Sequence, residues 1–452
     1  ARVVLLHLWH FYLWIAISIT TCYASDRTFP LLVDERSGVR CGVLMGDGGS
    51  GYGSSQWVLP HTNFNGLVRS LFVPSLSMAD AKPDPAPVLN LLNAFRSSQA
   101  LFVAVELGIF EILQASNSPI SLEELRDRVA HRQRQPISPD GLDRLCRTCV
   151  ALGLIQSPSP GLFALTPVSE SYLVASSPTS LAGYCTHSAQ VVWQLFGDLS
   201  SAVASGAHVW QQAFGQPGSD VFARIYSTPV AVLRFLRGMH SFAALSAPSV
   251  VTAFDLSSAT SLVDLGGATG ALARAACESY PTLRSAVVVD LPHVVADARE
   301  HFAPPPGGPC DGRLSWLAAD FFAEPEKLPQ QVDVVVLSRI LHDWDPPRCR
   351  QLLALSYRLL RPGGSLLVAE MLLDADRVGP LPVLLQDLNM LCQTHGRERS
   401  AAEYSQLLGD AGFVGCDARK TGSYLDAVIA RKPSGPQEAG EKPSDTALNG
   451  CV

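Results

Sequence analysis

The sequence predicts an α/β fold in which a mainly parallel sheet ends in an antiparallel hairpin and follows a helical domain. A short apolar run, Ser261–Leu265, leads into a glycine-rich turn and an alanine-rich stretch with high helix propensity. Strand and helix signals alternate from there to residue 411, which is typical of a doubly wound parallel sheet. Two last strand signals, 413–419 and 424–430, are joined by a short turn, so we expect them to pair antiparallel.

The composition excludes some classes of protein. The chain has 452 residues, of which 47% are hydrophobic and 17% charged, enough for two or three domains with a large core. Its net charge of −7 argues against a nucleic-acid-binding surface, which is normally basic. Cys146 and Cys149 form a CxxC pair, but no second pair or nearby histidine pattern completes a zinc site. We therefore predict reduced core cysteines rather than metal or redox use.

Residues 1–77 do not show the pattern of a folded domain. Residues 3–21 are almost wholly apolar, and residues 22–77 have no sustained hydrophobic period. We interpret 1–77 as a non-folding extension or a gene-model artefact, with a membrane anchor in residues 1–24 as the alternative. The Pro-, Gly- and Ser-rich residues 433–452 are predicted to be a disordered tail.

Order is expected to begin in a domain at 78–180. Apolar residues at helical spacing cover 88–113, and Ser121 with Glu124 has the pattern of a capping box. A further helix at 138–152 precedes two short strand signals, at 153–156 and 161–166, that predict a β-wing.

Two helices and a wing make a winged-helix arrangement, which serves either DNA binding or packing and dimerisation. The chain is acidic, and the second helix carries only Arg144 and Arg147 as cations, so we favour a dimerisation domain. Residues 181–250 are predicted to form further helices whose aromatic side chains lie mainly in the core, with some roofing the site. These aromatic residues are Trp193, Phe196, Trp210, Phe214, Phe222, Tyr226, Phe235 and Phe242.

The domain at 251–432 carries the strands that should position a site. Strands are predicted at 261–265, 284–289, 313–318, 332–338 and 365–370, with helices at about 269–279, 292–302, 347–360, 382–394 and 401–411. Gly266, Gly267 and Gly270 follow the first strand, where glycines let a ligand approach the backbone closely. Asp290 ends the second strand, 20 residues after Gly270, which is the expected position of an acid that binds ribose hydroxyls.

Seven motifs resemble the small-molecule O-methyltransferases of the hydroxyindole (acetylserotonin) family, over about residues 88–432. They are Leu262-Val-Asp-Leu-Gly-Gly, Val289-Asp-Leu-Pro-His-Val-Val, Ala319-Asp-Phe-Phe, Arg339-Ile-Leu-His-Asp-Trp, Arg361-Pro-Gly-Gly, Leu388-Asn-Met-Leu and Gly396-Arg-Glu-Arg. The terminal hairpin is likewise typical of the class I S-adenosylmethionine-dependent methyltransferase sheet and fits a nicotinamide-binding fold poorly.

The resemblance implies a function and an assembly. The cofactor would be S-adenosylmethionine, and the methyl acceptor the hydroxyl of a small aromatic molecule, foremost a hydroxyindole such as N-acetylserotonin, giving melatonin. The resemblance also implies a homodimer formed through the N-terminal helical domain. We expect a cytoplasmic protein that binds no nucleic acid, and no membrane unless residues 1–24 are an anchor.

The resemblance further implies a role for individual residues. His342 matches the general base, and Glu370 and Glu398 match the carboxylates that orient it. The cofactor would be bound by Tyr226, Gly266, Gly267, Gly270, Asp290, Asp320, Phe321 and Arg339, with Phe321 stacking on the adenine and Asp320 beside it. The acceptor would be bound by Asp343, Asn389 and Gln393.

The residues alone leave alternatives open. His342 could equally be a helix-cap or core histidine, and Glu370 a salt-bridge partner. Glu398 could be a charge at a helix N-terminus. Asp320 could be a turn residue and Phe321 a core residue. Gln386, Asn389 and Gln393, at i, i+3 and i+7 of a helix, could be a solvent-facing polar stripe. A phenol with a pKa near 10 would give its proton to an ordinary histidine at a cost of about 5 kcal/mol, so no metal is required.

Three positions depart from the family's pattern. Ala268 stands in the glycine loop, Ala319 precedes Asp320, and Phe242-Ala243 stands where the acetylserotonin enzyme has a tryptophan. They leave a second hypothesis: a paralogue with other or no turnover that acts as a cofactor-binding or regulatory protein.

Overall fold

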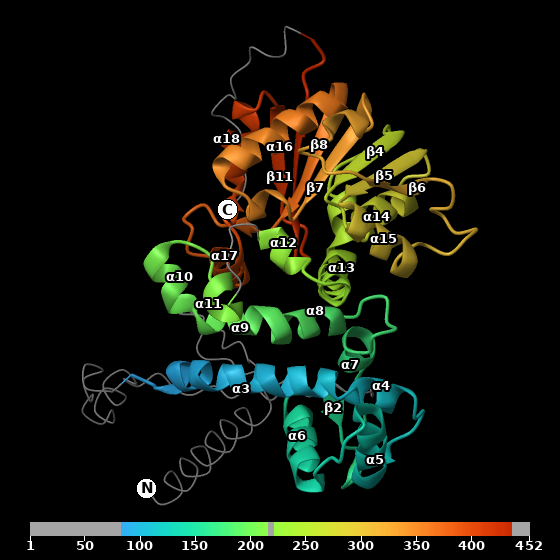
Figure 1. The fold of residues 1–452 in the computed structure, drawn as a ribbon, viewed down its shortest axis with the longest axis vertical. Coiled ribbons are helices and arrows are strands. Elements are labelled where there is room, and N and C mark those ends of the chain that lie inside the picture. Colours follow the sequence, from blue (N-terminus) through green and yellow to red (C-terminus); the bar gives the residue numbers. More distant parts are fainter. Residues whose placement is uncertain (1–82, 216–220, 436–452) are drawn as a thin grey trace, which may run out of the picture. The chain divides into compact units, whose positions relative to one another are not determined.

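A seven-stranded sheet forms the middle layer of the C-terminal domain in the computed structural model, which describes residues 83–215 and 221–435 (Figure 1). The predicted extension 1–77 and most of the predicted tail 433–452 lie outside these residues. The strands are β4 (Ser261–Leu265), β5 (Ser285–Asp290), β6 (Leu314–Ala318), β7 (Val332–Ser338), β8 (Leu360–Glu370), β11 (Val414–Arg419) and β12 (Asp426–Arg431), in the order β11-β12-β8-β7-β4-β5-β6.

The strand directions confirm the predicted terminal hairpin. Strands β4 to β8 pair in parallel, whereas β12 runs antiparallel to both β8 and β11. The chain order reverses between β4 and β7, which are neighbours in the sheet. Because ligands of open α/β sheets bind at the carboxyl ends of strands beside such a switch point, this edge is where a site is expected.

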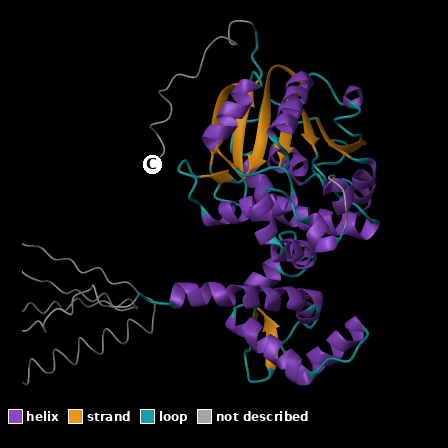
Figure 2. Cartoon of the chain, turned by 60° about the vertical axis from the view of Figure 1, so that its left-hand side comes forward, coloured by secondary structure: helices purple, strands orange, loops and turns teal. Residues whose placement is uncertain are grey.

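Helices cover both faces of the sheet (Figure 2). One face packs against α13 (Pro229–Val251), α14 (Ala271–Ser279) and α15 (Pro292–His301), and the other against α16 (Pro346–Leu359) and α18 (Ala401–Asp410). Successive residues of β4 alternate between the two cores, as the pleat of a strand requires.

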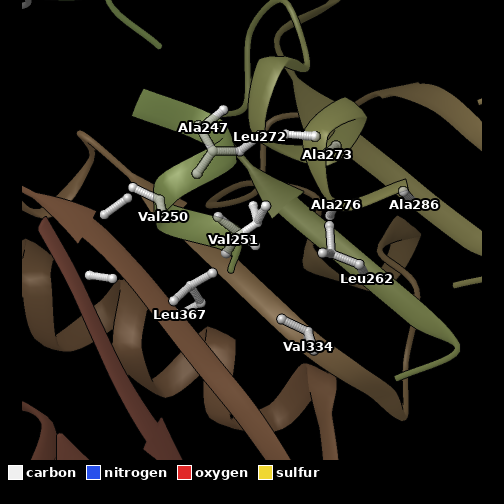
Figure 3. Close-up of a cluster of buried hydrophobic side chains, with 14 of the residues drawn as sticks. Ala247, Val250, Val251, Leu262, Leu272, Ala273, Ala276, Ala286, Val334 and Leu367 are labelled. Atoms are coloured by element: carbon white, nitrogen blue, oxygen red, sulfur yellow. The ribbon is translucent and has the colours of Figure 1, made fainter. Parts of the chain in front are cut away.

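The first of these cores is shown in Figure 3, where Leu262 of β4 and Val334 of β7 lie near Val251 of α13 and Leu272 of α14. The neighbouring residue Val263 belongs to the other core. Burial of each such side chain stabilises the fold by about 1.5–3 kcal/mol.

Most strand and helix boundaries agree with the predicted ones within two residues. Strand β8 is the exception, because it begins at Leu360 and takes in the Pro-Gly-Gly turn, where its pairing with β7 shifts register. Strand β12 begins at Asp426, whose carboxylate accepts hydrogen bonds from the backbone N–H groups of Leu372 (3.2 Å) and Thr421 (3.2 Å).

The N-terminal domain contains the predicted helices and wing. It comprises α3 (Ala86–Glu106), α4 (Ile109–Gln114), β1 (Ile120–Ser121), α5 (Leu122–Gln133), α6 (Pro139–Ala151), β2 (Ile155–Gln156) and β3 (Leu162–Leu165), and β3 pairs antiparallel with both β1 and β2. The predicted capping box is wrong in one half. Ser121 accepts from the backbone N–H of Glu124, but the Glu124 carboxylate pairs with Arg128 (2.6 Å) one turn further on.

The CxxC pair lies in the core of this domain, as predicted. Cys146 and Cys149 are both fully buried on α6. Burial raises the pKa of Cys146 to about 12 and that of Cys149 to about 11, so both stay protonated and unreactive at neutral pH.

Helix α3 exposes an unusual number of apolar side chains. It is long and apolar enough to cross a membrane by length and composition alone, a property that it shares with core helices of soluble proteins. The exposed side chains on it include Val88, Leu89, Leu91, Leu92, Phe95 and Val103. Phe95 and Phe102 also contact the ring of Trp193 (6.4 and 6.3 Å between centroids).

The predicted helical roof at 181–250 consists mostly of short helices. They are α8 (Ala182–His187), a π-helical segment (Ser188–Val192), α9 (Trp193–Gly197), α10 (Leu199–Ser205), α11 (Trp210–Phe214), α12 (Val221–Ile225) and α13, while α7 (Pro167–Tyr172) precedes them. Helix α17 (Leu381–Gln393), from the later part of the chain, packs beside α9 and α10.

Candidate active site

A cavity lies at the carboxyl ends of β4, β5 and β7 and is covered by residues of α8, α12 and α13. Many of the predicted site residues line it, namely Tyr226, Gly266, Gly267, Asp290, Arg339, His342, Asp343, Asn389 and Gln393. Residues from five separate parts of the sequence therefore meet at the predicted edge of the sheet.

His342 lies in a short 3₁₀ turn after β7, with two buried carboxylates behind its ring. Its Nδ1 atom is 2.7 Å from Oε1 of Glu398 and 3.4 Å from Oε2 of Glu370, and both glutamates are fully buried. Because Nδ1 donates to Glu398, the lone pair of the neutral ring is on Nε2. Nε2 lies 3.6 Å from Oδ1 of Asp343, another cavity-lining residue.

The backbone around His342 is held from two sides. Oε1 of Glu370 accepts hydrogen bonds from the N–H groups of Ile340 (3.1 Å) and His342 (3.3 Å). Arg399, whose role the sequence did not suggest, donates to the carbonyl of Leu341 (2.9 Å).

A short parallel ladder brings the second carboxylate into place. Strand β9 (Leu372–Leu373) follows β8 directly, and β10 (Arg399–Ser400) pairs with it. Glu370 and Glu398 precede these two strands, so the ladder places both carboxylates beside the same imidazole. Glu370 therefore pairs with His342, as the salt-bridge alternative expects, and also accepts backbone hydrogen bonds from the turn that carries His342.

The carboxylates around His342 favour its protonated form. Burial disfavours the imidazolium, but Glu370, Glu398 and Asp343 together outweigh burial and raise the pKa of His342 to about 9. Burial likewise raises the pKa of Glu370 to about 7. These groups interact strongly, so their protons are shared by the cluster. A base with a pKa near 9 takes the proton of a phenol at a cost of only about 1.4 kcal/mol, against about 5 for an ordinary histidine.

His342, Glu370 and Glu398 also have the composition of a metal site, since one ligand atom from each lies within 4.8 Å of the others. The short Nδ1–Oε1 contact is instead a charge-assisted hydrogen bond, and it occupies the nitrogen that a metal would need. We therefore interpret the cluster as an oriented base.

The glycine loop lines the same cavity. Gly266 has φ 69°, and a Cβ atom there would lie 2.5 Å from Cδ1 of Ile340. Asp290, buried at the end of β5, accepts from the N–H groups of Ala268 (3.0 Å) and Leu291 (2.8 Å). The loop thus keeps its backbone close to the cavity.

Two charged side chains on the cavity lack partners among the described residues. They are Arg339, through Nε and Nη1, and Asp264, through Oδ1. Burial, and then Asp290, raise the pKa of Asp264 to about 7. A zwitterionic amino-acid group could pair with both, so the residues fit the methionine end of S-adenosylmethionine. Asp264 was not among the predicted site residues, although a carboxylate ending an apolar strand was the available signal.

Three predicted cofactor residues do not line the cavity. Asp320 accepts from the N–H groups of Phe322 (2.8 Å) and Ala323 (3.1 Å), as a turn residue does. Phe321 packs against Phe322, with 4.8 Å between ring centroids. Gly270 caps α14, and a Cβ atom there would lie 3.1 Å from Trp316. The adenine-binding role of Asp320 and Phe321 stays a prediction.

The amides of α17 are buried, so the interpretation as a solvent-facing stripe is wrong. Gln386, Asn389 and Gln393 are each only 6–7% exposed. Gln393 donates to Oδ1 of Asn389 (2.5 Å), and Asn389 donates to Oε1 of Gln386 (3.4 Å). Asn389 and Gln393 line the cavity, whereas Gln386 does not.

Ala268 has a left-handed backbone conformation, with φ 47°. This conformation costs a residue with a Cβ atom about 1–2 kcal/mol, a strain that glycine relieves. Glycine also raises the conformational entropy of the unfolded chain, which offsets part of the stabilisation. Ala268→Gly is therefore expected to raise the free energy of unfolding by about 0.5–1 kcal/mol, measured by denaturant titration.

Ala115→Gly serves as the control for this substitution. Ala115 is an exposed residue with φ −69° at the end of α4, so its replacement should instead destabilise the protein. A loss of stability in both variants would contradict backbone strain at Ala268.

The strand order and the cavity at the switch point are those of S-adenosylmethionine-dependent methyltransferases, and the buried base beside the glycine loop suits transfer to an oxygen. Comparisons with known proteins agree. An O-methyltransferase domain matches residues 196–414, and an O-methyltransferase dimerisation domain matches residues 89–175.

Individual relatives match over three quarters of this chain or more. The chain is 41% identical to acetylserotonin O-methyltransferase of Bos taurus, over 75% of this chain and 95% of that protein. It is 39% identical to the enzyme of Gallus gallus, over 77% and 97%. The solved structure of human N-acetylserotonin methyltransferase in complex with S-adenosylmethionine superposes with a TM-score of 0.72 at 35% identity, covering 79% of this chain and 100% of that one. The chain belongs to the O-methyltransferase family and is an S-adenosylmethionine-dependent enzyme.

Proposed function

We propose that the protein methylates the hydroxyl of a small hydroxyindole, with N-acetylserotonin as the foremost acceptor. The observation that supports an active enzyme most strongly is the 2.7 Å hydrogen bond between Nδ1 of His342 and Glu398, which turns Nε2 into the acceptor of a proton. The names of the relatives support the choice of acceptor. The retained base argues against the alternative of a paralogue without turnover.

Different residues of the cavity would orient the acceptor and remove its proton. The sulfonium of S-adenosylmethionine supplies the activated methyl group. Asn389 and Gln393 would orient the acceptor, so that its oxygen lies near the donor; such alignment contributes about 7–11 kcal/mol. Nε2 of His342 takes the hydroxyl proton as the bond to carbon forms, and Glu398 and Glu370 stabilise the imidazolium that results.

The purified protein is expected to convert N-acetylserotonin and S-adenosylmethionine into a methyl ether, detected by mass spectrometry. N-acetyltryptamine, which has the same side chain but no hydroxyl, is the matched control and should give no product. Calorimetric binding of S-adenosylmethionine without product from any hydroxyindole would favour the paralogue instead.

The assembly and location belong to the same proposal. The exposed apolar side chains of α3 fall within or next to the matched dimerisation domain, which supports a homodimer through this helix. The eight cysteines within 83–215 and 221–435 are all unpaired, which supports a reducing compartment such as the cytoplasm.

A further inference from the structure

His187 is a cavity residue without an assigned role. It ends α8, is only 3% exposed and lines the cavity. Nδ1 is buried without a hydrogen-bond partner in the part of the chain that the structure describes. Its ring meets Phe235 edge-on, with 5.6 Å between centroids. A buried polar ring in this state loses its hydrogen bonds to water unless a molecule in the cavity restores them.

The fold holds this side chain rigidly. Helices α8 and α13 approach so closely that glycines are needed at the contact: a Cβ atom on Gly238 would lie 2.9 Å from Cβ of His187, and one on Gly183 would lie 2.6 Å from the carbonyl of Arg237. The π-helical segment Ser188–Val192 begins at the next residue. Such segments are frequent at functional sites, and here Val192 lines the same cavity as His187.

The imidazole is uncharged at neutral pH. Burial lowers the pKa of His187 to about 4, with further contributions from the cations Arg234 and Arg339. A neutral imidazole offers one donor and one acceptor, and it suits an uncharged partner. The charged ends of the cofactor already have counterparts in the guanidinium of Arg339 and the carboxyl of Asp264, which each have side-chain atoms without a hydrogen-bond partner among the described residues.

The surroundings of His187 suit an uncharged aromatic ligand. His187 enters the cavity from α8 and its ring packs against Phe235, while Val192 and Met239 line the same cavity. An apolar wall with one neutral polar group is typical of sites for aromatic ligands. We propose that His187 recognises an uncharged hydrogen-bonding group of the acceptor away from the reacting hydroxyl, namely the amide of an N-acylated side chain. This inference rests on the proposed function.

The test compares two acceptors that differ in this amide. For His187→Phe, kcat/KM with N-acetylserotonin should fall about tenfold, while kcat/KM with 5-hydroxyindole, which lacks the side chain, should change less than about twofold. The affinity for S-adenosylmethionine, measured by calorimetry, should not change. His187→Gln, which keeps a donor and an acceptor, should restore much of the preference. His187→Leu is measured in parallel, because it fills less space than phenylalanine.

His301→Phe is the matched control, since His301 ends α15 and does not line the cavity. An equal loss with both acceptors, an unchanged preference, or weaker cofactor binding would overturn the role of His187. Failure of the unmodified enzyme to methylate any hydroxyindole would instead overturn the proposed function, so the two failures are distinguishable.

Discussion

Replacement of His342 by alanine is expected to lower kcat by about 10²- to 10⁴-fold, the usual contribution of a general base. The imidazole has Glu398 and Glu370 on its Nδ1 side and lines the cavity, so its loss removes the proton acceptor that these two carboxylates orient. Steady-state rates of methyl ether formation measure the effect. Affinity for the cofactor should remain, because the glycine loop is untouched.

The control for this variant is His131→Ala, an exposed position on α5.

The pH profile gives an independent check on the role of His342. Because the pKa of His342 is raised to about 9, kcat/KM should rise with pH between about 6 and 9 as the base loses its proton. Glu398→Gln removes one of the anions that raise this pKa, so the rise should occur at lower pH. An unaltered rate in His342→Ala would disprove its assignment as the base.

The second large effect is expected at Glu370. Glu370→Leu removes a buried carboxylate and leaves the N–H groups of Ile340 and His342 without their acceptor. The free energy of unfolding should fall by about 3–5 kcal/mol, as for other buried charge partners. Denaturant titration measures the loss, and kcat should fall with it because the turn that carries the base is then held only from the side of Arg399.

Glu370→Gln separates the hydrogen bonds from the charge. Its side-chain carbonyl can still accept from both N–H groups, so stability should fall by only about 1 kcal/mol. The pKa of His342 should drop, because the negative charge of Glu370 is one of the interactions that raise it. Equal instability of the leucine and glutamine variants would show that the backbone hydrogen bonds are not the cause.

The sheet could be predicted from the sequence because its strands are nearly continuous apolar runs ending in polar residues. β4 and β7 have the predicted bounds for this reason. The capping box at Ser121 failed because a local motif cannot show that Glu124 has a competing partner in Arg128. The strands β2 and β3 are short, but turn residues bound them clearly in the sequence.

The site was predictable in part. His342, Glu370 and Glu398 were named from family motifs, but the pattern of residues alone left each with a structural alternative. Their meeting depends on a ladder between segments far apart in the chain, which periodicity cannot show. The burial of Asn389 and the missing partner of His187 depend likewise on packing between helices.

The ladder between β9 and β10 has a consequence for how such an enzyme changes its acceptor. The chain from Glu370 to Glu398 starts and finishes at the same imidazole, and α17 with its acceptor-facing amides lies between. An insertion or deletion in the segment between Glu370 and Glu398 would displace Glu398 and so lower the pKa of His342. Exchange of side chains on the cavity face of α17 leaves both ends in place. Substrate preference in this architecture can therefore diversify by point substitution on one helix. The length of the segment from Glu370 to Glu398 is meanwhile kept constant, because both of its ends must reach His342.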